Sequence, residues 1–155
     1  MRKIKVEMLT EEAFAPYGKI ISPEGREDLG APGSHSLFPQ VVVREEPTSV
    51  NLMEVFPKEF VCKKFEAHDH TEETLIAMTG GVIVPVMPKD EFNVEHLKAF
   101  YVPKGTGICC APGVWHFAPY VLGESVWCTV IFKNNTSHDD IYFKELDETI
   151  GMELA

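Results

Sequence analysis

Short extended segments, each bounded by a turn signal, recur along this chain, and no long helical pattern interrupts them. Their residues are largely β-branched, aromatic or aliphatic, and the turns between them contain dipeptides such as Gly80-Gly81 and Pro112-Gly113. Many short strands at near-regular spacing are typical of an all-β barrel or sandwich with antiparallel pairing. The predicted strands are residues 40–44, 49–55, 60–68, 74–78, 82–87, 99–102, 107–110, 116–121 and 126–132.

The amino-terminal segment predicts one more strand and a short helix before a long loop. Apolar and charged residues alternate over residues 4–8, as in a half-buried strand. Thr10 is a suitable N-cap, and acids occupy the first turn of the helix expected over 11–15. Residues 19–21 return to an extended run. Residues 22–36 are rich in Gly, Pro, Ser and charge, which predicts a long loop over one end of the barrel.

A length of 155 residues, 45% of them hydrophobic, suits one domain with a single core. We therefore expect one domain over residues 1–155, with its core at about 60–133. Residues 139–154 mix apolar and acidic side chains without a clean period and receive no assignment. Residues 82–87 and 126–132 are apolar on both faces, so we expect them inside the sheet pair or at a subunit contact. The second of these segments favours a homodimer.

The net charge of −10 is spread along the chain, which predicts a solvated acidic surface. Such a surface repels phosphate backbones and anionic lipid heads, so we expect neither nucleic acid nor a membrane as a partner. The chain starts without the apolar run of a signal peptide, and no apolar stretch approaches the length of a membrane span. The four cysteines lack CxxC spacing, and three of them lie in apolar strand-like runs that predict buried, reduced thiols, so we expect a cytoplasmic protein.

Three histidines and a glutamate form the pattern in this chain that most clearly indicates a chemical site. His68 and His70 stand two apart at the end of an expected strand, where residues i and i+2 share a face and can bind one ion. Glu73 follows after a short turn, and His116 comes from a distant strand. We expect these residues to hold one divalent metal ion, and ligand type alone does not choose among Zn, Mn, Fe, Ni and Co.

The same residues resemble the two motifs of the cupin superfamily, which implies an RmlC-like antiparallel barrel or jelly roll. Glu73 and Gly80 keep the spacing with which the first motif ends, and the second motif is matched at Gly105, Gly113 and His116, with its proline shifted to Pro112. Only two residues, Thr71 and Glu72, separate His70 from Glu73, where the family usually has three or four. This short turn leaves Glu72 as an alternative ligand, although we favour Glu73.

A narrower resemblance extends over nearly the whole chain, to the ureidoglycolate lyase (ureidoglycolate hydrolase) family of single-domain cupins in allantoin breakdown. The segment 9–18 resembles that family's opening helix, which ends at Tyr-Gly. Residues 65–68 resemble its Leu-Glu-x-His, and 114–116 match its Val-Trp-His. His70 and Glu73 stand where the family typically has other residues, so we expect a divergent member that is closer to a standard metal cupin.

The family resemblance implies elimination of urea from ureidoglycolate, or a reaction of a related small hydroxy or ureido acid. Glu66 shares strand parity with His68, so we expect it to face the cavity as a base or as a partner of the metal ligands. Lys64 has the same parity and is expected to hold the substrate carboxylate, although a charge at the barrel mouth explains it equally well. Two alternatives stay open: a metal-dependent cupin isomerase or dioxygenase, and a non-catalytic module that binds a small acid.

Overall fold

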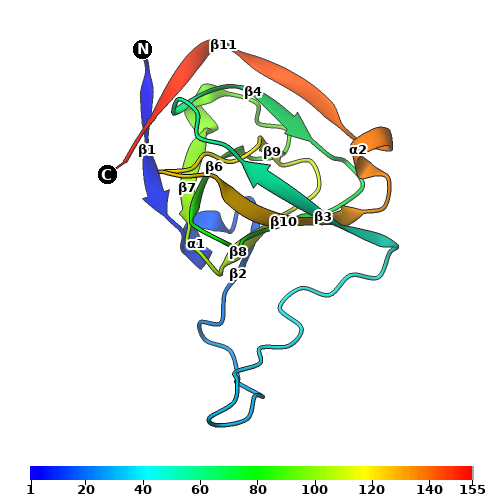
Figure 1. Cartoon of the computed structure of the whole chain (residues 1–155). Coiled ribbons are helices and arrows are strands. Elements are labelled where there is room, and N and C mark those ends of the chain that lie inside the picture. Colours follow the sequence, from blue (N-terminus) through cyan, green and yellow to red (C-terminus); the bar gives the residue numbers. More distant parts are fainter. Residues whose placement is uncertain (155) are drawn as a thin grey trace.

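Two β-sheets and very little helix make up the chain in the computed structural model, which describes residues 1–154 (Figure 1). One sheet closes into a barrel with the strand order β1-β11-β4-β9-β6-β7, and the other has the order β2-β8-β5-β10-β3. The predicted all-β barrel is therefore confirmed. The strands are β1 (Lys3–Met8), β2 (Gly18–Ile21), β3 (Thr48–Val55), β4 (Val61–Ala67), β5 (Glu73–Ala77), β6 (Val82–Met87), β7 (Lys98–Val102), β8 (Gly107–Cys110), β9 (Trp115–His116), β10 (Val126–Lys133) and β11 (Tyr142–Glu153).

Pairing between strands is antiparallel except around β1. This strand runs parallel to both of its neighbours, β7 and β11, because it enters the sheet between two strands that belong to the second half of the chain. The predicted antiparallel pairing therefore has one exception, this strand. Its consequence is that β1 closes the barrel, leaving that sheet without a free edge.

The three short helical elements lie in connections between strands and not in the core layers. They are α1 (Glu11–Phe14), the 3-10 turn η1 (Val94–His96) and α2 (Thr136–Asp139). The predicted cap of α1 is confirmed, since the Thr10 hydroxyl accepts a hydrogen bond of 3.1 Å from the Ala13 N–H. Phe14 on this helix is fully buried and packs edge-on against Phe100 of β7, which fixes the helix over one end of the barrel.

The core lies between the sheets and inside the barrel, and β6 is buried along its whole length, as predicted from its apolar residues. In β10 the residues alternate instead: Cys128, Val130 and Phe132 are buried, while Trp127 is 42% exposed. The inner side chains of β3, β5 and β10 therefore form one wall of the space between the two sheets, and their outer side chains face solvent.

Three segments differ from the sequence-based expectation. Residues 40–44 form no strand, because no described strand lies beside them to pair with, and Gln40 at their start takes a positive φ of 58°. The strand expected over 116–121 is limited to β9 and one bridge between Ile83 and Tyr120. The unassigned segment 139–154 contains β11. The register of this strand against β4 shifts between Glu145 and Ile150, so the alternation of buried and exposed residues is interrupted and could not be recognised in the sequence.

Candidate metal centre

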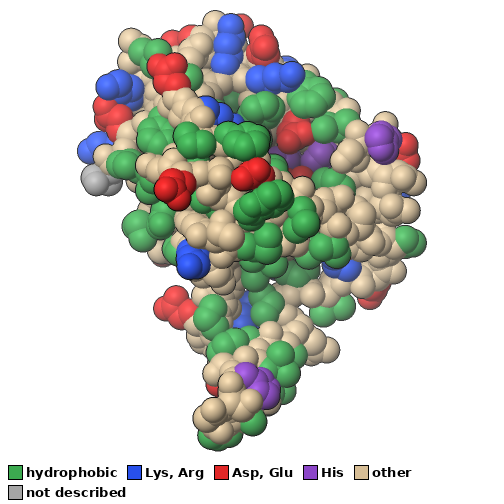
Figure 2. Space-filling view, in the orientation of Figure 1, with side chains coloured by type: hydrophobic (Ala, Val, Ile, Leu, Met, Phe, Trp, Pro, Cys, Tyr) green, Lys and Arg blue, Asp and Glu red, His purple; other side chains and the backbone are tan. Residues whose placement is uncertain are grey.

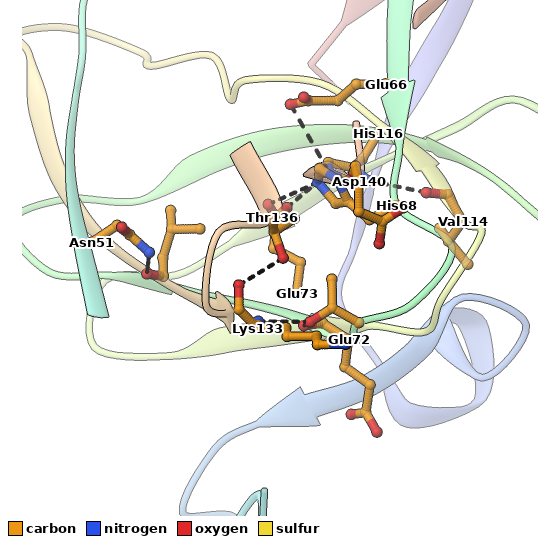
Figure 3. Close-up of polar contacts among 12 residues, drawn as sticks. Asn51, Glu66, His68, Glu72, Glu73, Val114, His116, Lys133, Thr136 and Asp140 are labelled. Atoms are coloured by element: carbon orange, nitrogen blue, oxygen red, sulfur yellow. Dashed lines mark hydrogen bonds and ion pairs between the residues drawn. The ribbon is translucent and has the colours of Figure 1, made fainter. Parts of the chain in front are cut away.

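Three side chains meet between the two sheets: His68 directly after β4, Glu73 at the start of β5, and His116 on β9 (Figure 3). One ligand atom from each lies within 4.8 Å of the other two. The His116 Nε2 lies 2.8 Å from Glu73 Oε2, and the His68 Nε2 lies 3.4 Å from Glu73 Oε1. Both histidines are buried, and in Figure 2 histidine and acidic side chains lie together in a hollow of the surface.

Backbone carbonyls fix the orientation of both imidazoles. His68 Nδ1 lies 2.7 Å from the carbonyl oxygen of Asp140, and His116 Nδ1 lies 3.0 Å from that of Val114 (Figure 3). A carbonyl oxygen can only accept, so each Nδ1 carries the proton. In the neutral ring the lone pair is then on Nε2, the atom that faces Glu73.

The Nε2 atoms of His68 and His116 are buried without a partner of hydrogen-bond geometry, even though Glu73 is close. Buried polar atoms are rarely left in this state, and a bound ion is one explanation. Two imidazole nitrogens and a carboxylate, with room for further ligands, suit a divalent transition metal. The three residues therefore fit a metal ion by both their chemistry and their lack of other partners.

The three side chains also form a strongly coupled electrostatic group. Burial acts to raise the pKa of Glu73, but the two histidines outweigh burial and hold that pKa well below its usual range. For His116, burial lowers the pKa, while the carboxylates of Glu73 and Glu66 raise it, to about 9. Without a metal the group therefore attracts a proton to the site, and a metal ion must replace that proton when it binds.

Glu66 on β4 lies beside this group as the direct cross-strand partner of His116. Its Oε1 is 4.0 Å from the His116 Nε2 (Figure 3). Burial and the neighbouring Glu73 raise the pKa of Glu66, and His116 opposes them. A carboxyl group with a raised pKa, next to three candidate ligands, is suited to move protons near neutral pH.

A cavity of about 220 Å³ opens onto these four residues, with β3, β5 and β10 on one side and residues 117–119 on the other. Residues 117–119 leave the sheet after β9, which opens the cavity mouth where the sequence predicted a continuous strand. The walls are mainly apolar, and no Lys or Arg of the described chain lines them. The remaining lining residues are Asn51, Met53, Leu75, Phe117, Ala118, Pro119, Val130, Phe132, Ser137 and Ile141.

Two of the predicted site residues lie elsewhere. The His70 side chain is exposed and does not join the metal-binding group, because β4 ends at Ala67 and the i, i+2 rule no longer applies. Lys64 shares the face of Glu66, but its Nζ lies 4.4 Å from the centre of the Phe143 ring and it does not line the cavity. The alternative ligand Glu72 is also turned away, since its carboxylate accepts a hydrogen bond of 2.9 Å from the Cys109 thiol.

Comparison with known proteins decides the family. The family model described as Ureidoglycolate lyase matches residues 1–153. The chain belongs to the ureidoglycolate lyase family. Among curated relatives, the ureidoglycolate lyase of Burkholderia mallei (strain NCTC 10229) is 29% identical over 133 residues, which cover 80% of this chain and 78% of that one. The one from Pseudomonas fluorescens (strain SBW25) is 27% identical, with 97% and 96% covered.

Membership of the ureidoglycolate lyase family confirms the narrower family resemblance and the lyase class of the enzyme. Among solved structures, oxalate decarboxylase from Bacillus subtilis is similar at a TM-score of 0.47 and 19% identity, with 65% of this chain and 24% of that chain covered. None of the helices within residues 1–154 has the length and apolar character needed to span a membrane.

Asp140 is a site residue that the sequence did not reveal in this member of the ureidoglycolate lyase family. Besides its carbonyl contact with His68, its carboxylate accepts hydrogen bonds from the N–H groups of Asp69 and His70, at 2.9 and 2.8 Å. It therefore holds the turn that follows β4. Asn51 was also missed, although it lines the cavity from β3. Neither residue belongs to a motif, and each reaches the site only through the fold.

Proposed function

We propose that this chain releases urea and glyoxylate from ureidoglycolate, with a divalent metal ion held by His68, Glu73 and His116. The relatives named above are ureidoglycolate lyases, which supports this substrate. The observation that carries the metal is the convergence in one cavity of the Glu73 carboxylate and two buried imidazole Nε2 atoms that have no hydrogen-bond partner. The donor set suits Zn, Mn, Fe, Ni or Co.

The charge of the cavity explains why a metal is needed. Ureidoglycolate is an anion, yet the protein groups around the cavity include two carboxylates, Glu66 and Glu73, and none of the chain's lysines or arginines within the described residues. With both imidazoles neutral, as metal ligands must be, the two carboxylates would repel an anionic substrate unless a bound cation offset their charge. A bound divalent ion supplies this charge and, as a Lewis acid, makes the substrate hydroxyl easier to deprotonate.

Glu66 is the residue that we assign to proton transfer. Its carboxylate takes the proton of the substrate hydroxyl, the C–N bond to the ureido nitrogen breaks as the carbonyl of glyoxylate forms, and the same proton returns to the departing nitrogen of urea. The reaction then needs no net proton, oxidant or reductant. The raised pKa of Glu66 makes it a stronger base than an exposed carboxylate and a usable acid in the second half of the step.

Asn51 is placed to recognise the ureido group. Its amide Nδ2 already donates to the Val130 carbonyl at 3.1 Å and to Ser49, so its Oδ1 is the atom left to interact with a ligand. An amide oxygen accepts from N–H groups, and urea offers several. The apolar side chains of Met53, Val130 and Phe132 around it keep water from the reacting atoms.

We place this reaction in allantoin breakdown, the purine catabolism that the resemblance implies, and in the cytoplasm. The four cysteines of the chain are free and buried, which is consistent with a reducing compartment. We also propose a homodimer. Val50 and Leu52 of β3 and Trp127 of the adjacent β10 are apolar side chains exposed on one sheet face, where a second copy could cover them.

Glyoxylate release from racemic ureidoglycolate, measured after the purified protein is loaded in turn with each candidate metal, tests the proposal. We expect release above the spontaneous rate with at least one metal, and its loss in Glu66→Gln and His116→Ala. Glu59→Gln is the matched control, because Glu59 is exposed just before β4. No release with any metal would refute the lyase, and substrate-dependent oxygen consumption would favour a dioxygenase instead.

A further inference from the structure

One lysine, Lys58, contacts the wall of the cavity from outside. It lies in the connection 56–60 between β3 and β4. Its Nζ donates a hydrogen bond of 3.3 Å to the carbonyl oxygen of Ala118. Ala118 belongs to the segment 117–119, which forms one side of the cavity that holds the candidate metal ligands. The ammonium of Lys58 is therefore held against the rim of this cavity, although the residue is not one of those that line it.

Two aromatic rings help to hold the ammonium in this place. The Lys58 Nζ lies 4.2 Å from the centre of the Tyr120 ring and 5.6 Å from that of the Phe117 ring. A ring face attracts a cation. Tyr120 is itself immobilised, since it is buried, its hydroxyl donates to the Val61 carbonyl at 2.7 Å, and its backbone pairs with Ile83. The fold thus provides a fixed platform for one positive charge beside the cavity mouth.

The ammonium of Lys58 retains unused capacity to bind an anion. It has three N–H donors, and the Ala118 carbonyl takes one of them. Lys3 and Lys98 form ion pairs with glutamates, but no carboxylate within the described chain is paired with Lys58. Partial burial lowers the pKa of Lys58, because the ammonium has lost some of its water. A partly dehydrated cation with free donors is stabilised by an anionic ligand.

We propose that Lys58 selects anionic substrates at the cavity mouth, where its ammonium attracts and orients the substrate carboxylate. The acidic side chains that line the cavity are Glu66 and Glu73, so Lys58 adds positive charge at the rim of a site whose own walls carry negative charge. Lys64 lacks this position, since its Nζ lies over Phe143, which is not a lining residue. The inference rests on the proposed function and names the protein group that receives the carboxylate.

Three variants separate the charge of Lys58 from its contact with the rim. Lys58→Gln removes the charge but keeps an N–H donor for the Ala118 carbonyl, and Lys58→Arg keeps both. Lys63→Gln is the matched control, because Lys63 is exposed on the adjacent β4 and its replacement changes the net charge equally. We expect Lys58→Gln to raise the KM for ureidoglycolate by about threefold to tenfold with kcat retained, and the increase to shrink at high salt.

The KM of Lys58→Arg and of Lys63→Gln should stay close to that of the wild type. A Lys58→Gln enzyme with an unchanged KM would overturn the proposal. Loss of kcat without a change in KM would overturn it as well, because it would assign Lys58 a role in the reaction step and not in substrate selection.

Glycolate and its neutral amide, glycolamide, test the selection of charge without turnover. Purified protein saturated with Zn, which is diamagnetic, is titrated with each compound and followed by NMR. We expect the wild type to bind glycolate more tightly than glycolamide. Lys58→Gln should weaken glycolate binding by about threefold to tenfold and leave glycolamide binding unchanged.

This titration also separates the inference from the proposed function. If no glyoxylate is released but the glycolate preference depends on Lys58, the lyase proposal fails and the selection of anions at this residue stands. A wild type without a preference for glycolate would overturn the inference. Equal weakening of both compounds in Lys58→Gln would overturn it too, because Lys58 would then act only through the packing of the rim.

Discussion

His68 and Asp140 are 72 positions apart in the chain, yet the Nδ1 of His68 lies 2.7 Å from the Asp140 carbonyl oxygen. The Asp140 carboxylate at the same time accepts hydrogen bonds from the N–H groups of Asp69 and His70. One residue from the segment between α2 and β11 therefore sets both the ring orientation of a proposed ligand and the turn on which it stands.

Asp140→Ala removes the two hydrogen bonds that the Asp140 carboxylate accepts from the turn after β4. The backbone carbonyl of residue 140 can still contact His68 Nδ1, but the turn that positions His68 is then held less firmly. We expect metal affinity to fall by about 10- to 100-fold, which is typical of losing a group that orients a ligand. The free energy of unfolding should fall by about 1 kcal/mol. Isothermal titration with metal and thermal melts measure both effects. Asp139→Ala, at the exposed end of α2, should leave both quantities unchanged.

Glu72 and Glu73 are adjacent carboxylates with different surroundings, which makes them a matched pair. Glu73 faces both histidines, whereas Glu72 accepts a hydrogen bond from the Cys109 thiol. We expect Glu73→Gln to weaken metal binding by at least about 10- to 100-fold, while Glu72→Gln retains it. Competition with a coloured chelator gives the two affinities, and equal loss in the two variants would show that the charge of this segment matters more than coordination.

The stability of the metal-free protein should fall as pH rises from about 6.5 to about 9. Burial acts to lower the pKa of His116, but the carboxylates of Glu73 and Glu66 outweigh burial. They raise this pKa from 6.5 in the unfolded chain to about 9 in the folded protein. A raised pKa contributes stability that is complete below 6.5 and is lost as pH rises through the folded value. Melting temperatures of chelated protein measure this trend.

Glu73→Gln is the control for this pH dependence, because it removes the main carboxylate that favours the protonated imidazole. Its melting temperature should change less between pH 6.5 and 9. With saturating metal the trend should reverse, since the metal binds neutral histidine and competes better as protons become scarce. A chelated wild type whose stability rises over this range would contradict the coupling.

The cysteines should be inert in the folded protein. Burial raises the pKa of Cys62 to about 12 and that of Cys128 to about 11, and burial together with the Glu72 carboxylate raises that of Cys109 to about 11. At pH 8 the reactive thiolate is therefore scarce as well as inaccessible. A disulfide reagent should label no thiol in the native state and all four after denaturation. Rapid native labelling would show that a buried strand opens readily.

The sequence predicted the parts of the fold that depend on local patterns. Thr10 caps its helix, and β6 and β8 have the predicted bounds. The errors arise where tertiary structure overrides a local pattern. The valines of 40–44 favour a strand, but the connection 22–47 that contains them has no neighbouring described strand with which they can pair.

The candidate metal site shows the same limit. Strand parity placed His70 beside His68, but β4 ends before either histidine and the Asp140 carboxylate holds the turn that follows. No pattern in residues 60–80 could reveal this, because Asp140 comes from a segment whose own strand was not predictable. Glu66 lines the cavity, as strand parity within β4 predicted, and Glu73 lines it as the spacing of the resembled motif implied.

Metal content per chain tests the central claim, that His68, Glu73 and His116 form the metal site and His70 does not. Each protein is stripped, reloaded with the metal that supports activity, desalted and measured by elemental analysis. We predict roughly one ion per chain for the wild type and for His70→Ala, and none for His116→Ala. A wild type that retains no metal, or a His116→Ala protein that retains as much as the wild type, would contradict the claim.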